Sequence, residues 1–174
     1  RFMWKHRDLF QAELTGLTEA IQIAEDTEGL TVFSDAADAT ASGASGDSNE
    51  ILKGLIEHKF SKSALIPIVD ARAVALAFAS GTGATHNFAL GGTCDPGRFA
   101  PLTVNARVVS LHREGFIYED GTEGDPGRVA VLIIGDRFLI LATEKPVFVV
   151  GQKVFQSHGL EPETFDLVVV KSPN

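Results

Sequence analysis

The residues best suited to chemistry lie in one loop of small and polar amino acids, residues 34–48. The loop contains three carboxylates, Asp35, Asp38 and Asp47, together with Ser42, Gly43, Gly46 and Ser48, and it has no bulky side chain. Free backbone N–H groups at a loop that ends on a helix N-terminus can bind an anion or orient a ligand. The pattern is neither a dinucleotide fingerprint nor a P-loop, because G-x-G-x-x-G and the Gly-Lys-Ser/Thr ending are both missing. The alternative is an ordinary strand-to-helix connection whose Gly and Ser residues only satisfy turn geometry.

The elements on either side of the loop should position these residues. Residues 30–33 form an apolar run that is typical of a buried strand. After the loop, Ile51, Leu52 and Leu55 recur at helical spacing. Asp47 and Glu50 are three residues apart, as in a capping box, so the sequence predicts that Asp47 is the N-cap of this helix. By contrast, Asp35 and Asp38 have no structural role in this pattern, and we expect them either to contact a ligand or to support the residues that contact it.

Lys171 and Ser172 are a second candidate pair, because they follow the apolar run at 167–170. Side chains at the carboxyl end of a buried strand can reach a ligand. The alternative is a solvated strand end, since such residues are also common at loop ends.

Other catalytic arrangements have little support. The five histidines show no H-E-x-x-H or other close ligand spacing, so we assign no metal ligand and no catalytic residue in this chain. The segment Gly43-Ala44-Ser45-Gly46 is one residue short of a G-x-S-x-G elbow. A nucleophilic Ser45 or Ser48 would also need a histidine base that the sequence does not identify. Asp95 directly follows the single cysteine, Cys94, which argues against a reactive thiol.

The fold class predicted from these patterns is α/β with mixed α+β character. The N-terminal half alternates helices and strands, including a strand at 64–69 and a helix at 71–80 that begins after an Asp70 N-cap. Pro67 suggests that the strand at 64–69 lies at an edge of the sheet. The C-terminal half is largely antiparallel, with a long strand at 102–112 and a hairpin turning at Gly135 and Asp136. The sequence also allows a helix at 149–158.

Composition limits the classes of function. The 174 residues suit one domain with a real core, and the net charge of −8 without basic clusters argues against nucleic acid and anionic membranes as partners. There is no signal peptide pattern and no apolar run of membrane length. A lone cysteine fits a reducing cytoplasm, which is the compartment we expect.

The string from Ser34 to Ser48 resembles a signature of the microcystinase C family of zinc metallopeptidases, D-x-x-D-N-P-G-G-G-A-P-G-D-S-T. The match consists of Asp35, Asp38, Gly43, Ala44, Gly46, Asp47 and Ser48, whereas the Asn-Pro and a glycine of the family motif are missing. Further similarity lies in G-x-G-A-T at 81–85, Gly91-Gly92 and V-V-V-K-S at 168–172.

The resemblance implies that residues 30–174 form the C-terminal domain of a peptidase that hydrolyses amide bonds of short or cyclic peptides. Residues 1–29 would be a lead-in helical segment from an absent N-terminal domain, which would carry the zinc that activates water. This chain would then bind no zinc, would be inactive alone, and would form one wall of the active-site cleft. Its partners would be that domain and a peptide substrate, and a homo-oligomer is compatible with the sequence. The alternative is a non-catalytic module that binds a ligand or mediates oligomerisation.

Overall fold

The computed structural model describes residues 1–10, 14–94 and 96–173, without the side chains of residues 7 and 10. Its α-helices are α1 (Phe2–Lys5), α2 (Leu17–Asp26), α3 (Glu50–Glu57), α4 (Ala71–Ser80) and α5 (Lys153–Gln156). Short 3-10 helices are η1 (Arg7–Phe10), η2 (Ala36–Asp38), η3 (Thr40–Ser42) and η4 (Pro162–Thr164). The strands are β1 (Thr31–Ser34), β2 (Ala64–Val69), β3 (Thr85–Leu90), β4 (Leu102–His112), β5 (Phe116–Ile117), β6 (Glu123–Gly124), β7 (Val129–Ile134), β8 (Phe138–Thr143) and β9 (Leu167–Val170).

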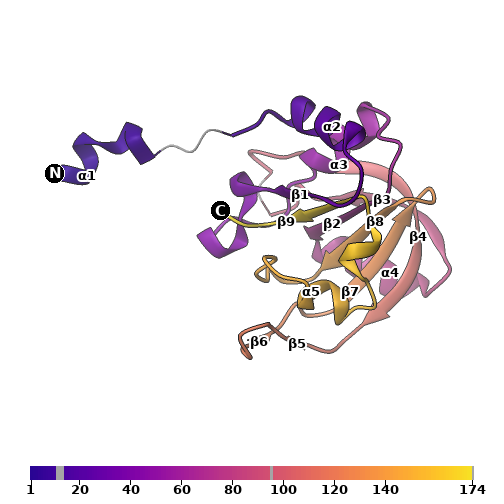
Figure 1. Ribbon diagram of the computed structural model, residues 1–174. Helices are drawn as coiled ribbons and strands as arrows, with labels where there is room; N and C mark the ends of the chain where they lie inside the picture. Colours follow the sequence, from indigo (N-terminus) through magenta and orange to yellow (C-terminus); the bar gives the residue numbers. More distant parts are fainter. Residues whose placement is uncertain (11–13, 95, 174) are drawn as a thin grey trace.

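A mixed seven-stranded sheet in the order β1-β9-β2-β8-β7-β4-β3 organises the molecule (Figure 1). The strands β1, β9, β2 and β8 run parallel to one another, whereas β8, β7, β4 and β3 are joined by antiparallel pairs. The predicted mixed α/β class is confirmed. The last strand of the chain, β9, is inserted between β1 and β2 and completes the parallel part.

The sheet has a core on each face because its strands alternate their apolar side chains. In β2, Ile66 and Ile68 belong to the core on one face, whereas Leu65 belongs to the core on the other. Helices α2, α3 and α4 pack on the first face through residues such as Ile21, Leu55 and Val74. The second face is covered by α5 and its flanking segment, including Val149, Phe155 and Leu160.

Pro67 does not lie on an edge strand, so that prediction is wrong. Strand β2 is internal and wholly buried, but β9 pairs with it only through Ala64 and Leu65. Pro67 follows the end of this pairing, where its missing N–H breaks no ladder bond to β9. Beyond it, the N–H of Val69 donates to the carbonyl of Gly46, so the 34–48 loop covers the edge that β9 leaves open.

Two further segments differ from the sequence patterns. The region at 149–158 is helical only over α5, and Val149 forms an isolated bridge with Lys171. At the other end of the chain, residues 1–10 form an arm that projects away from the body (Figure 1). Among its side chains, Phe2, Met3, Trp4 and Leu9 are all exposed. Residues 11–13 of the predicted lead-in segment lie outside the described residues.

Candidate functional site

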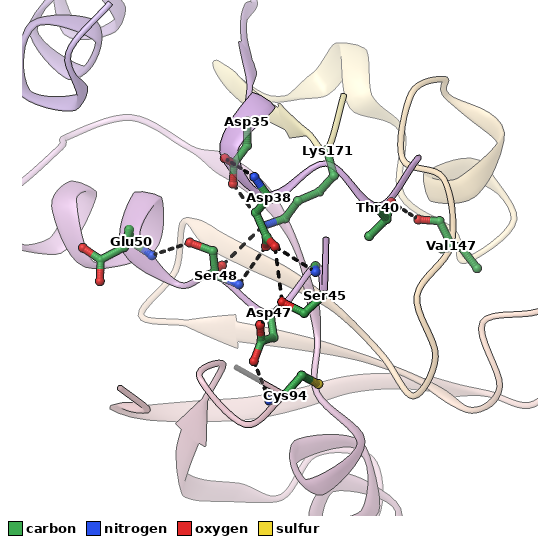
Figure 2. A network of polar contacts seen from close by, with 11 residues as sticks. Asp35, Asp38, Thr40, Ser45, Asp47, Ser48, Glu50, Cys94, Val147 and Lys171 are labelled. Atoms are coloured by element: carbon green, nitrogen blue, oxygen red, sulfur yellow. Dashed lines mark hydrogen bonds and ion pairs between the residues drawn. The ribbon is translucent and has the colours of Figure 1, made fainter. Parts of the chain in front are cut away.

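The candidate site lies where the parallel strands end. Asp35 follows β1, Asp70 follows β2 and Lys171 follows β9, so all three charged residues lie at the carboxyl edge of the parallel strands. In α/β proteins this carboxyl edge is where ligands bind. The polar network that fills it is shown in Figure 2.

The side chain of Asp38 is the centre of this network and is fully buried. Its carboxylate accepts hydrogen bonds from the N–H groups of Gly46, at 2.9 Å, and Ser48, at 2.8 Å. It also accepts one from the ammonium group of Lys171, at 2.7 Å (Figure 2). Asp38 therefore holds the 34–48 loop in shape, which corrects the expectation that it has no structural role.

Lys171 is likewise buried, with 3% of its side chain exposed, so the alternative of a solvated strand end is wrong for this residue. Its ammonium group donates to Asp38, to Asp35 at 3.1 Å and more weakly to the carbonyl of Ser48. A buried lysine requires such partners because desolvation of its charge is otherwise very costly. The carbonyl of Ser172 accepts a hydrogen bond from the hydroxyl of Ser34.

Asp35 takes part in the polar network and also lines a cavity. One carboxylate oxygen accepts the N–H of Asp38, and the other accepts from Lys171. Asp35 and Ser48 also line an open cavity of about 580 Å³ between α2, β1 and the start of α3. Of the predicted ligand-facing carboxylates, Asp35 is thus the one that the structure places against a cavity.

Asp47 is not the N-cap of α3, which corrects the capping-box prediction. The helix begins at Glu50 after Asn49, whose side chain does not cap it, and the N–H of Glu50 makes a long contact with the hydroxyl of Ser48. The buried carboxylate of Asp47 instead accepts from the hydroxyl of Ser45 and from the N–H of Cys94, at 2.6 Å. Asp47 therefore ties the 34–48 loop to the segment after β3.

The glycines of the loop have different roles. Gly46 has φ +76°, and a Cβ there would lie 2.7 Å from methyl groups of Thr40 and Val69, so this position requires glycine. Gly43 closes η3 in the left-handed conformation, next to the exposed Ser42. The N–H groups of Ser42 and Gly43 donate to the carbonyls of Ala39 and Thr40, so these residues form the outer turn of the loop.

Sequence reasoning missed the contacts that Asn49 and Asp70 make with the end of β3 and the segment after it. Asn49 donates through its amide nitrogen to the carbonyls of Leu90 and Ala100. Asp70 is the predicted N-cap of α4, which is confirmed, and it also accepts the N–H of Gly91 at 2.9 Å. Its burial raises the pKa of that carboxyl. The position of Asn49 next to a predicted helix start was the only local signal for its role. Its partners, Leu90 and Ala100, are distant in the sequence.

Nucleophilic chemistry finds no support within the described part of the chain. Ser45 and Ser48 contact carboxylates and backbone groups, and neither has a histidine partner there. Burial raises the pKa of the Cys94 thiol, which keeps it protonated at neutral pH. A serine–histidine contact does occur elsewhere, between Ser110 and His112 on β4, at 2.9 Å.

A resident metal does not fit the side chains either. Within residues 1–10, 14–94 and 96–173, no three His, Cys, Asp or Glu side chains are grouped so that they could hold a metal ion. The carboxylates of Asp35 and Asp38 share the Lys171 ammonium group instead. In the same part of the chain, none of the helices combines the length and apolar character needed to cross a membrane.

Comparisons with known proteins agree with the loop motif. Residues 33–174 match the sequence model of the family described as MlrC C-terminus. A curated relative, "Microcystinase C" of Sphingomonas sp., is 29% identical over 141 residues, which are 81% of this chain and 28% of that protein. A crystal structure described as that of a "Putative metallopeptidase" of Mesorhizobium sp. BNC1 matches with a TM-score of 0.88 and 30% identity. The matched region covers 99% of this chain and 35% of the chain in that crystal structure. The chain therefore spans about a third or less of these relatives.

Proposed function

The chain belongs to the family of MlrC C-terminal domains, and on that premise we propose that it is the C-terminal part of a metallopeptidase. The enzyme would hydrolyse amide bonds of short or cyclic peptides, and this domain would form one wall of its active-site cleft. The names of the two relatives, a microcystinase and a metallopeptidase, support this activity.

The observation that carries the proposal is the cavity beside the family motif. Its volume of about 580 Å³ lies in the range of sites for small ligands, and apolar side chains make up most of its walls. The Asp38–Lys171 pair fixes the loop, so Asp35 and Ser48 are held at this cavity by buried contacts. A rigid support of this kind is what a substrate-positioning loop needs.

The catalytic metal of such an enzyme has no place among the described residues of this chain. We therefore assign it, as zinc, to the part of the longer protein that lies outside residues 1–174. The role of this chain is then to bind and orient the substrate, and no residue here is assigned to the chemical step.

The test compares two proteins. The longer protein encoded by the gene should hydrolyse short peptides and lose that activity on treatment with a chelator, with recovery on addition of zinc. The 174-residue chain, purified alone, should hydrolyse none of them. Turnover of the same peptides by the isolated chain, or by the chelated longer protein, would refute the proposed division of roles.

The exposed arm favours a second candidate, a module for assembly. Phe2, Met3, Trp4 and Leu9 are each more than 60% exposed, and apolar side chains gathered on one short segment mark interaction sites. Light scattering of the chain decides this case, since a stable dimer that becomes monomeric on deletion of residues 1–10 would support assembly.

A further inference from the structure

Exposed apolar side chains are concentrated at the start of the chain. Of the thirteen large apolar side chains that the described residues leave exposed, eight lie within residues 1–32. They are Phe2, Met3, Trp4, Leu9, Leu14, Ile23, Leu30 and Val32, and together we call them the N-terminal apolar surface. Single exposed residues of this kind are normal on a protein, whereas a gathered set marks an interaction site.

The part of this surface that belongs to the body lies at an edge of the sheet. Leu14, Ile23 and Val32 all line the open cavity beside Asp35. Strand β1, which carries Val32, is the first strand in the sheet order, and its four residues have no charged side chain. Exposed edge strands are usually protected by charged side chains or covered by another element. Because β1 has no such charges, we expect another element to cover it.

The arm also lacks support from the rest of the chain. None of the four residues of α1 is buried, and the arm projects away from the body (Figure 1). So short a helix is not stable in water by its own hydrogen bonds, because most helical stability in proteins comes from packing an apolar face. A surface outside this chain is therefore what would hold α1.

The relatives indicate what lies against the N-terminal apolar surface. The matched crystal structure takes in 99% of this chain, and so includes most of the arm, yet the match is only 35% of that crystallised chain. The matched family is described as the C-terminus of MlrC, so the remainder of such a chain precedes the matched region. A preceding part is joined to the tip of the arm. The chain itself then keeps it close to the surface, so a modest contact area is enough.

We propose that the preceding part of the longer protein docks on the N-terminal apolar surface. Its apolar side chains cover Ile23 and Val32 and pack against the arm, so it adds the wall that the open cavity beside Asp35 lacks. This assignment rests on the proposed function. It locates the contact between the two parts on the arm, α2 and β1, and not on the exposed apolar residues elsewhere on the body.

Matched cysteine variants test which part of the chain is covered. Ile23→Cys and Val32→Cys place a thiol on the surface, at positions that are 52% and 55% exposed. Ile117→Cys and Val150→Cys are the controls, because the same residue types are 52% and 53% exposed there but lie outside it. Each variant is made in the 174-residue chain and in the longer protein. Iodoacetamide labels the introduced thiol, and mass spectrometry of the peptide that contains it gives the rate.

The four thiols should react at similar rates in the 174-residue chain. In the longer protein, labelling at positions 23 and 32 should slow about tenfold or more, since tenfold protection requires only about 1.4 kcal/mol of contact free energy. Labelling at positions 117 and 150 should not change. Unchanged rates at 23 and 32, or equal slowing at all four positions, would overturn the proposal. If labelling at 23 and 32 slows in the 174-residue chain as its concentration rises, a second copy covers the surface and the proposal also fails.

A further variant tests the arm. The side chain of Leu9 is exposed in this chain, so Leu9→Ser should leave the melting temperature of the 174-residue chain unchanged. The same change should lower the melting temperature of the longer protein, because there the side chain is buried by the docked part. The control Ile117→Ser should affect the two proteins alike. If Leu9→Ser leaves the longer protein as stable as before, the arm does not form the proposed contact.

The labelling rates are independent of peptidase activity, so this inference and the proposed function can fail separately. If positions 23 and 32 are protected while the longer protein hydrolyses no peptide, the docking surface stands and the peptidase assignment fails. If the longer protein hydrolyses peptides while positions 23 and 32 react as fast as in the 174-residue chain, the peptidase assignment stands and this inference fails.

Discussion

The ammonium group of Lys171 lies 2.7 Å from a carboxylate oxygen of Asp38, and the two residues are 133 positions apart. Both side chains are buried, so each neutralises a charge that would otherwise be costly to hold away from water. The contact fastens the carboxyl end of β9 to the 34–48 loop. It therefore links the last strand of the chain to the residues that line the cavity.

Breaking this pair should strongly destabilise the domain. Asp38→Asn or Lys171→Met leaves a partly compensated buried charge, and such changes typically cost about 3–5 kcal/mol. Urea unfolding of each variant gives the free energy of unfolding. The control is the exposed pair Lys145–Asp125, whose removal should change stability little. If Asp38→Asn lowers the free energy of unfolding by no more than the control does, the buried ion pair does not stabilise the domain as proposed.

Asp47→Ala should loosen the segment after β3 and leave α3 intact. The variant loses the acceptor for the N–H of Cys94, whereas the start of α3 does not depend on this carboxylate. Hydrogen exchange should therefore speed up at Cys94, with little change at Lys53 in α3. Asp70→Ala is the contrasting variant, since it removes a real N-cap and should cost about 0.5–2 kcal/mol. Faster exchange at Lys53 in the Asp47 variant would restore the capping interpretation.

A histidine pair should make the domain sensitive to mild acid. The rings of His112 and His158 lie 5.1 Å apart, and burial lowers the pKa of both imidazoles. The unfolded chain then binds protons more readily than the folded one, so stability falls as pH drops through the ordinary histidine range near 6.5. Thermal melts between pH 8 and pH 5 should show this loss. In the double variant His112→Gln and His158→Gln, the melting temperature should depend less on pH. The variant His86→Gln, on the exposed part of β3, should keep the pH dependence of the wild type.

Glu144 should contribute a separate loss at lower pH. Its carboxylate accepts hydrogen bonds from Arg128, which lower its pKa to about 2. The stabilisation is present above the ordinary glutamate pKa of 4.5 and is lost as pH falls towards the folded value. Melts of wild type and Glu144→Gln between pH 6 and pH 2 should therefore converge at the acid end. If the melting temperatures of the two proteins differ by the same amount at every pH in that range, the Arg128–Glu144 pair adds no pH-dependent stability.

The isolated chain should hold far less than one zinc ion per molecule after dialysis. Among the described residues, no three His, Cys, Asp or Glu side chains are grouped around one point where they could hold a metal ion. The carboxylates of Asp35 and Asp38 already share the Lys171 ammonium group. Elemental analysis measures the content directly. A stoichiometric zinc that a chelator removes would show that the chain has a site which this structure does not display.

Local patterns predicted the strands and the Asp70 cap well, because period-two apolar alternation and this cap are encoded in neighbouring residues. The site was harder, since its central contacts join residues that no local pattern relates. Asp47 illustrates the difficulty. Its spacing to Glu50 fits a capping box, but its carboxylate accepts a hydrogen bond from the N–H of Cys94. Lys171 follows an apolar strand, and only the position of β9 inside the sheet reveals that this lysine is buried.

The insertion of β9 between β1 and β2 also constrains how the protein is made. The two neighbours of β9 are synthesised more than a hundred residues earlier, so the parallel half of the sheet has a gap until the final strand emerges. Pairs so distant along the chain form slowly, because a long loop must close first. Until then, the edges of β1 and β2 are open to other chains. A ribosome that stops before Leu167 would release a chain with this gap and without Lys171, and such a product is a natural substrate for chaperones and proteases.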